Sequence, residues 1–532
     1  MKRKIVASLT FLLLCLTAGS ALASLASNNV PLDSPVYLYL DKLAGMGVIG
    51  SDFKGIRPIT RSEAARLVKE AEKGLPRKSV PPLAAELAAE LRRHLADELF
   101  YLENPHQAVT GSLHPVSRAK ARYAYLDGEA RDYRRYVRDP GGEGVFGIGS
   151  GLRPSNPPDA VALQQGSEGT PLLENNEGVR YQSGSNLDLT LTSEARGGRG
   201  VTMLLEPRFV TTDGLINLRL NKGYVKLGGG GLELEIGRDA NWLGFGQRGA
   251  ITLSDNAKNF DLIKLSSPEP LDAGFLGKFK YALIFSRFDR VTTDNGVRQP
   301  YFYAIKASLK PDPQVEIGIN LGRQQGGPGV NNSFSSYFKG LVGGTHEDNS
   351  NSLGGVELRW RIPELGNTEL YGEFSGEDAA KFWPFVESYL AGIYIPSLTA
   401  DARNDLRFEY FQGNRILYTH GQFSEGYVYK GMPIGHSQGG ATQDFFLRYS
   451  HWFDVRSSAG LDLMHTVRGN LGRVDGQAIE RKGGARLFCR FPLADRLNLG
   501  ASLGTERVRN MNLQPGVNRN NTIAILEMVY WH

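Results

Sequence analysis

Cysteine is almost absent from this chain of 532 residues, which contains only Cys15 and Cys489. Cys15 lies in an apolar run that we expect to be removed on export, so the mature chain keeps a single thiol and cannot form an internal disulfide. Cys489 lies in the stretch ARLFCRF, where a small apolar strand residue is a better interpretation than a nucleophile. Folding must therefore depend on packing and hydrogen bonding.

Long hydrophobic runs are also missing. The one apolar run, from Ile5 to about Thr17, follows three basic residues and precedes Ala21-Leu22-Ala23. This pattern predicts a signal peptide over residues 1–23, with an apolar run too short to span a bilayer. No later stretch of about twenty apolar residues follows, which excludes a bundle of membrane-spanning helices.

A strong excess of charge of one sign is the third feature that the chain lacks. The formal net charge is +5, and the expected signal peptide carries three basic residues and no acidic one, so the mature chain is near +2 (5 − 3). So small a charge gives no reason to expect nucleic acid as a partner.

The start of the expected mature chain, residues 24–109, is typical of a small helical module. Ser34 is an expected N-cap with proline after it, and Thr60-Arg61-Ser62-Glu63 forms a capping box. From Leu83 to Leu99 a leucine recurs at every fourth position, which predicts a third helix with one apolar face. A module with so few helical residues buries little surface by itself. We therefore expect it to dock on a larger body.

The remainder, residues 110–532, has the period of two that strands show. VELRWRI at 356–362 alternates apolar with charged side chains, and the stretches INLRLN, LELEI, FKYALIF and LNLGASLG repeat the period. Two architectures give this pattern: a soluble stack of sheets and a transmembrane barrel.

Size and charge favour the barrel. Roughly 420 residues make about 18 strands, within a range of roughly 16 to 20, which is many for one soluble β domain and ordinary for an outer-membrane barrel. Charged faces on strand after strand suit a polar lumen, and only a closed barrel satisfies every backbone group in lipid without helices. The chain also ends in TIAILEMVYWH, an aromatic terminal strand followed by His532. We therefore predict a mainly β protein, a large antiparallel outer-membrane barrel over 110–532 preceded by a small helical module.

Long Gly/Pro/Ser-rich stretches at 141–169, 324–352 and 413–440 read as loops, expected on the outer side. The glycine-rich stretch RDANWLGFGQRGAITLSDNA at 238–257 invites a phosphate-binding interpretation. Such a loop needs a helix N-terminus after it, whereas another strand, DLIKLS, follows here. A tightly packed inward fold or a sugar-contacting platform fits its Trp242 and Phe245 better.

Three blocks of the chain resemble the Wzi family of capsule assembly proteins. They are GRDANWLGFGQRGAITLSDNA (237–257), LRWRIPELGNTELYGEFSGEDA (358–379) and YTHGQFSEGYVYKGMPIGHSQGG (418–440), and the N-terminal pattern PLDSPVYLYLDKLAGMGVI…RPITRSEAARLVKEA agrees with them. Where the family commonly has Trp-Gly-Pro-Gly, this chain has Trp242-Leu243-Gly244-Phe245-Gly246, so the bend differs.

The resemblance implies a barrel whose inner end is capped or plugged by the helical module. It also implies a lectin that attaches or assembles capsular or related polysaccharide at the cell surface, with no cofactor or metal. By residue type and motif, the candidates for sugar contact are Asp239, Trp242, Asn256, Tyr371, Glu373, His420, Tyr429 and His436. A packing or lumen-network role is the alternative for each. The expected partners are surface polysaccharide and outer-membrane lipid.

Two other functions compete. The helical module also resembles an S-layer homology unit, which would make the protein a porin anchored to the cell wall. An enzyme would need a nucleophile elbow, which the sequence lacks. Glu373, Glu377 and Asp378 could form a glycosidase pair, but fit more easily as lumen charges paired with Arg359 and Arg361. We therefore expect no catalysis.

Overall fold

The structure is a computed structural model. It describes residues 25–76, 80–139, 160–212, 215–293, 296–329, 350–377, 383–384, 386–420, 423 and 425–532. The expected signal peptide over 1–23 lies outside the described residues, as do Asp378 and much of the loops expected at 141–169 and 324–352.

Among the described residues, four helices precede the barrel: α2 (Pro35–Gly45), α3 (Arg61–Gly74), α4 (Pro82–His94) and α5 (Ala96–Glu103). The Ser34 side chain accepts a hydrogen bond from the Val36 N–H, and Thr60 Oγ1 accepts one from the Glu63 N–H, so both expected caps are present. Within the described ranges, no helix is long and apolar enough to cross a membrane.

The third expected helix is in fact two. Leu95, with a φ of −123°, separates α4 from α5, so the leucine stripe from Leu83 to Leu99 bends between two short helices. All five leucines of the stripe are nevertheless buried in one core with α2 and α3. Because of this bend, the apolar faces of the two short helices both pack against the same core.

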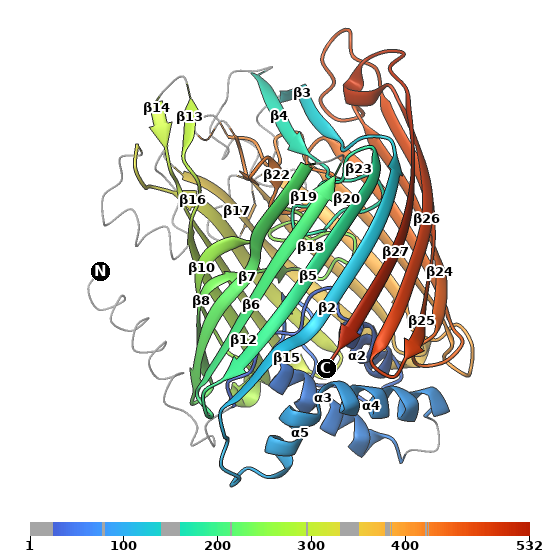
Figure 1. The fold of residues 1–532 in the computed structure, drawn as a ribbon. Helices are drawn as coiled ribbons and strands as arrows, with labels where there is room; N and C mark the ends of the chain where they lie inside the picture. Colours follow the sequence, from blue (N-terminus) through green and yellow to red (C-terminus); the bar gives the residue numbers. More distant parts are fainter. Residues whose placement is uncertain are drawn as a thin grey trace.

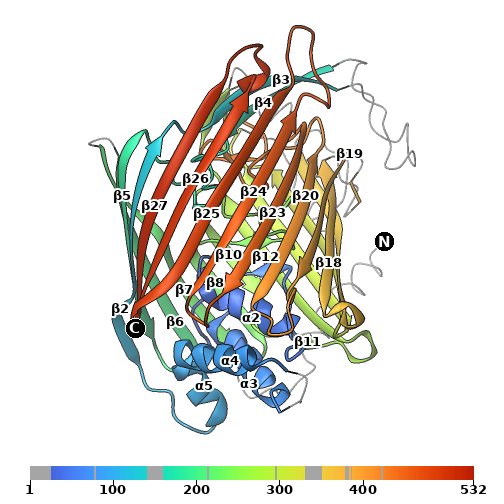
Figure 2. The same cartoon turned by 90° about the vertical axis from the view of Figure 1, so that its right-hand side faces the viewer.

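The described strands of the barrel close into one antiparallel cylinder, in which β2 pairs with β27 and seals the wall (Figures 1 and 2). Eighteen long strands form it, as predicted: β2 (Ser112–Asp127), β5 (Gly184–Arg196), β6 (Val201–Thr212), β7 (Leu215–Gly229), β8 (Leu232–Asp239), β10 (Phe260–Ser266), β12 (Lys278–Arg287), β15 (Tyr301–Asp312), β16 (Val315–Gln325), β17 (Ser350–Ile362), β18 (Thr368–Glu377), β19 (Val386–Ile395), β20 (Asn404–Gly413), β23 (Thr442–Trp452), β24 (Ser458–Arg468), β25 (Glu480–Ala494), β26 (Leu497–Arg509) and β27 (Arg519–Trp531).

Short pieces complete the sheet and the outer end. The two-residue β11 (Leu271–Asp272) adds to β12. Outside the wall, β3 (Asp132–Asp139) pairs with β4 (Ala160–Ser167), and β13 (Val291–Thr293) pairs with β14 (Gly296–Arg298). Both hairpins lie at the end away from the helices, at the top of Figure 1.

The wall is apolar outside and charged inside. On β17, Leu358 and Trp360 are 50% and 46% exposed, whereas Arg359 and Arg361 are 2% and 3% exposed. Because successive side chains of a strand point to opposite faces, the apolar residues face the surroundings and the arginines face the lumen. This is the polarity of a membrane barrel, in which lipid replaces the usual apolar core.

The expected pairing of Arg359 and Arg361 with Glu373 and Glu377 is wrong. Arg359 bonds to Glu316, Asp52 and Glu369, and Arg361 bonds to Asp52 and Glu369. The reason is that Asp52, from the chain between α2 and α3, enters the lumen and takes both guanidinium groups.

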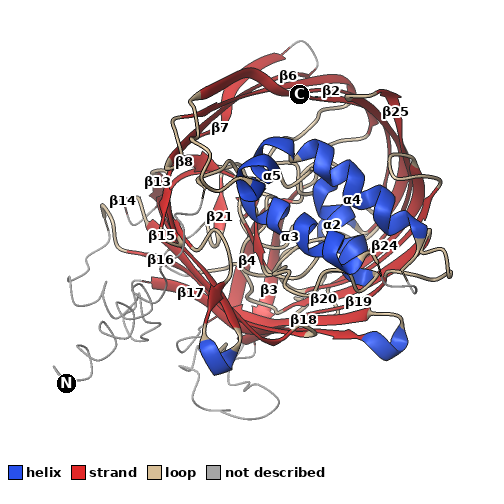
Figure 3. Ribbon diagram, turned by 90° about the horizontal axis from the view of Figure 1, so that it is seen from below, coloured by secondary structure: helices blue, strands red, loops and turns tan. Residues whose placement is uncertain are grey.

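The helical module lies across the opening of the barrel at one end, as the view from below shows (Figure 3). Its apolar core includes Ala402 and Trp452 from the barrel's lower turns. Besides the Asp52 contacts, buried ion pairs fix it to the wall: Lys42 pairs with Asp405 at 2.9 Å, and Glu98 pairs with Arg196 at 2.8 Å and, within the module, with Arg61 at 3.1 Å. Arg61, part of the expected capping box, therefore joins α3 to α5 within the module, and Arg196 of β5 joins Glu98 to the barrel wall.

Candidate functional site

The glycine-rich stretch is an inward fold. Residues 240–259 join β8 to β10 and run inside the lumen, where the two-residue β9 (Trp242–Leu243) pairs with β1 (Ile56–Arg57) of the helical module. The Arg57 guanidinium lies over the Trp242 ring at 4.7 Å and donates to the Gly246 carbonyl at 2.9 Å. The stretch thus connects the barrel to the module.

Glu373 fixes the bend of this segment. Its carboxylate accepts hydrogen bonds from the backbone N–H groups of Phe245 (2.8 Å), Gly246 (2.9 Å) and Ile251 (2.8 Å). Gly244 has a φ of +151°, and a Cβ there would lie 2.5 Å from Glu373 Oε1, so only glycine fits. This carboxylate, on β18, therefore substitutes for the anion that a phosphate-binding loop would hold.

A second inward segment between β20 and β23, of which residues 414–420, 423 and 425–441 are described, packs against the first. Tyr418 donates its hydroxyl to the Ile251 carbonyl at 2.6 Å. The Ser254 N–H donates to the Ile434 carbonyl at 2.8 Å, and Asn256 Nδ2 donates to the Pro433 carbonyl at 3.0 Å. Side chains of both segments and of the facing wall form an apolar core inside the lumen.

Six of the eight candidate residues hold this interior together. Asp239 accepts from Asn29 at 2.6 Å, Tyr371 bonds to Glu409 at 2.5 Å, and the His436 ring stacks on Phe411 at 3.8 Å between centroids. Trp242, Asn256 and Glu373 make the contacts described above, and all six are buried. Their burial favours the packing and network role, and sugar contact by them stays a prediction.

The two candidate histidines are held neutral. Burial lowers the pKa of His436 to about 3 and the pKa of His420 to about 4. His420 is half-buried, and its Nδ1 accepts from the Phe423 N–H at 3.2 Å. Neutral imidazoles offer one donor and one acceptor and no charge to a ligand.

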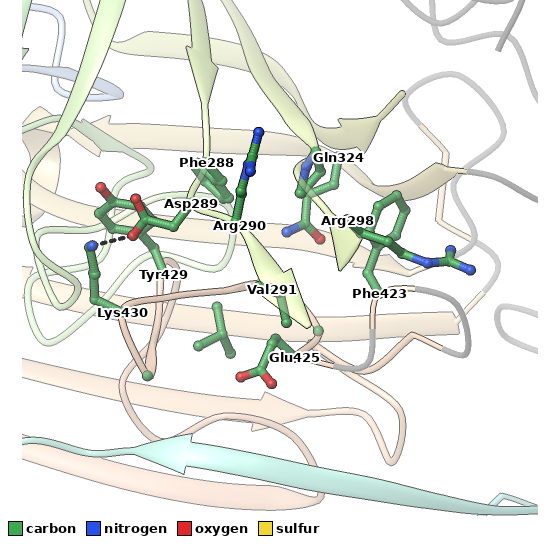
Figure 4. Close-up of a pocket in the computed structure, with 14 residues that line it drawn as sticks. Phe288, Asp289, Arg290, Val291, Arg298, Gln324, Phe423, Glu425, Tyr429 and Lys430 are labelled. Carbon is green, nitrogen blue, oxygen red and sulfur yellow. Dashed lines mark ion pairs between the residues drawn. The ribbon is translucent and has the colours of Figure 1, made fainter. Parts of the chain in front are cut away.

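A pocket of about 200 Å³ (Figure 4) opens beside β13 and β14, which lie at the end of the barrel opposite the helices (Figure 1). Tyr429, of the two-residue β21 (Val428–Tyr429), is the one predicted residue among those that line it. The Tyr429 and Phe288 rings lie 5.0 Å apart and, with Phe423, line its apolar floor, although all three side chains are largely buried, Phe288 and Tyr429 in the core beneath it. The pocket therefore draws on segments from three different places in the chain.

Charged side chains form the rim. Lys430 pairs with Asp289, and Arg290, Arg298 and Glu425 complete the set. Because Lys430 and Asp289 neutralise each other, the rim keeps two arginines against one carboxylate, that of Glu425. A floor of aromatic faces with a hydrogen-bonding rim suits a carbohydrate, whose rings present apolar C–H patches and hydroxyl edges.

Sequence reasoning missed most of this pocket. Phe288, Arg290 and Arg298 lie in a stretch around β13 and β14 that showed no motif, and only the third family block, which holds Tyr429, pointed here. The available signal was one of composition, since an aromatic and two arginines occur within eleven residues of one loop.

Comparison with protein families decides what kind of barrel this is. The model of the capsule assembly protein Wzi family matches residues 153–523, well over half of the chain. The chain belongs to the Wzi family. The resemblance seen in the three sequence blocks is thereby confirmed.

One solved structure shares the fold, and one curated protein is similar to part of the chain. Escherichia coli Wzi, described as an outer-membrane protein involved in group 1 capsule assembly and a carbohydrate-binding β-barrel, superposes with a TM-score of 0.66 at 17% identity, over 95% of this chain and 98% of that one. An uncharacterized 55.8 kDa protein in the cps region of Klebsiella pneumoniae is 26% identical over 171 residues. That match spans 30% of this chain and about a third (33%) of the relative.

The porin alternative is not favoured for this Wzi-family chain. A porin needs a water-filled passage, whereas the lumen here holds a packed apolar core made by Phe245, Ile251, Tyr427 and their neighbours. Arg61 lies in the motif that resembles an S-layer homology unit. Its guanidinium bonds to Glu98 and to the His94 carbonyl, so it is engaged within the helical module.

Proposed function

We propose that this protein lies in the outer membrane and holds capsular polysaccharide or exopolysaccharide at the cell surface as a lectin, without catalysing a reaction. The observation that carries the proposal is the pocket at the outer mouth. It combines an aromatic floor with a charged rim, and it lies above a lumen that is filled rather than open. Membership of the Wzi family supports the same role.

The geometry suits retention of a polymer. A pocket of about 200 Å³ is smaller than a drug-sized site, so it takes a single sugar unit. One such contact is weak, but a long polymer meets many copies of the protein, and its overall affinity rises through repeated binding. Release of the chain then requires many separate dissociation steps.

The rim arginines provide the direct test. Each charge-assisted hydrogen bond to a sugar contributes about 1.5–3 kcal/mol, so R290Q/R298Q should weaken binding of oligosaccharide fragments of the cell's own polymer about tenfold or more in calorimetry. Lys278→Gln, an exposed change at the inner end of β12, is the matched control and should bind like the parent.

Cells test the same role. A clean deletion should still make its polymer but shed it into the medium, and the R290Q/R298Q variant should shed part of it. If the cell-bound and released amounts of polymer are both unchanged in the deletion strain, the retention role is wrong.

A further inference from the structure

Three arginines face outward on β25 and β26, at the ends of these strands away from the helices, which are the upper ends in Figure 2. Arg481 is the second residue of β25, and Arg507 and Arg509 lie at the end of β26. All three are exposed, and they share the outward face with Leu487 and Leu503, which are 60% and 57% exposed. We call these three residues the arginine patch.

The register brings like charges together. Arg481 is the direct cross-strand partner of Arg509, an arrangement that places their Cβ atoms about 5 Å apart and destabilises the pair. The neighbouring carboxylates do not relieve it, because Glu480 and Glu506 face the lumen, where they are buried beside Arg131. In the part of the chain that the structure describes, no carboxylate pairs with any of the three arginines.

The nearest outward-facing carboxylate in the strand register is too distant to neutralise the arginine patch. Asp127 on β2 pairs with Thr522 of β27, which in turn pairs with Thr505 of β26. Asp127 therefore lies two strands away from β26, about 10 Å at the usual strand spacing. The patch keeps an uncompensated positive charge on the outer wall.

Its height matches the headgroup region of a bilayer. On β25 the outward residues run from Arg481 down to Leu493 over twelve positions (493 − 481). At about 3.3 Å per residue and a tilt of about 40°, this is a rise of about 30 Å, and the apolar band of such barrels is about 25 Å tall. With Phe491 and Leu493 at the lower edge, the patch lies just above the upper edge.

We infer that the arginine patch binds the phosphorylated headgroup of a glycolipid in the outer leaflet. A guanidinium group binds phosphate through two parallel N–H donors, and three such groups on two adjacent strands can surround one phosphate-bearing headgroup. The phosphate also supplies the negative charge that the Arg481–Arg509 contact lacks. This site is separate from the polysaccharide pocket and does not depend on it.

The test uses the full-length barrel in detergent, titrated with vesicles of phosphatidylcholine that contain lipid A or chemically dephosphorylated lipid A. We expect the parent to prefer the phosphorylated lipid, and R481Q/R507Q/R509Q to bind it about tenfold more weakly or worse. Arg287→Gln, an exposed outward change at the upper end of β12, should bind like the parent.

Other results would overturn the inference. Equal binding of the two lipids by the parent, or equal binding of lipid A by the triple variant and the parent, would show that the patch holds no phosphate. Competition by inorganic phosphate at a concentration equal to that of lipid A would show a site for the free anion and not for a lipid. Heat-modifiable mobility on a gel confirms that the triple variant is folded, and oligosaccharide binding by the pocket should be unaffected.

Discussion

Replacing Glu373 by glutamine should open the lumen segment without unfolding the barrel. The carboxylate is buried on β18 and accepts three backbone N–H groups, two at Oε1 and one at Oε2. Glutamine has the same shape, but its amide presents an N–H₂ donor to one of these N–H groups. At least one donor in the bend from Gly244 to Ile251 is then buried without an acceptor.

The size of the effect follows from the contacts. The expected free-energy cost is about 5 kcal/mol. It is the sum of one lost hydrogen bond to a charged group, one donor left unsatisfied and two weakened hydrogen bonds. The cost falls on the segment, because Glu373 takes no part in the sealing pair β2–β27. At equilibrium this raises the open population of the segment by a factor of about 4,000, since every 1.4 kcal/mol is tenfold.

Arg248 reports the opening, since it lies in this segment, is buried, and is a trypsin site. Cleavage after Arg248, followed by peptide mass spectrometry, should become faster in E373Q by about the factor by which the open state grows. Glu364→Gln, in an exposed turn, should leave the rate unchanged. Equal cleavage of E373Q and the parent, with both folded, would refute the assignment of Glu373 as the residue that holds the bend.

Three further changes test other contacts. Trp242→Ala removes a buried ring, at a cost of about 3–5 kcal/mol, and should lower the thermal midpoint while heat-modifiable mobility shows an intact barrel. His436 is held neutral, so its contribution to stability is present above its unfolded pKa of about 6.5 and is lost progressively as the pH falls from there toward about 3. Acid should therefore destabilise the segment in the parent and less so in His436→Gln, as tryptic fragments after acid exposure will show. Arg61→Gln leaves a buried carboxylate with one partner fewer, at a cost of about 3–5 kcal/mol, and should expose the helices to protease, whereas Arg92→Gln, on the module's exposed side, should not.

The wall could be predicted from the sequence because its period of two repeats on every strand. Leu358 and Trp360 alternate with Arg359 and Arg361 whatever lies in the lumen, so the pattern survives without knowledge of the neighbours. The caps at Ser34 and Thr60 are equally local, and both were predicted. The approximate number of the strands follows from the same kind of local signal.

The interior could not be predicted in the same way, because its contacts join residues far apart in the chain. Glu373 holds Phe245, which precedes it by 128 positions, and Asp52 reaches Arg359 across 307. No spacing in one sequence reveals such pairs. The motifs did locate the important segments, but they did not distinguish a side chain that contacts a sugar from one that supports the segment beneath it.

The segment 240–259 has a mechanical consequence. It contacts Ile434 of the second inward segment through Ser254, and it contacts the helical module through the pairing of Trp242 with Arg57. A pull exerted from outside the cell, by flow or by a neighbouring cell, is thus transmitted along a continuous run of backbone through the middle of the cylinder. The helical module then bears part of this force, which the contacts between the wall and the lipid would otherwise bear alone.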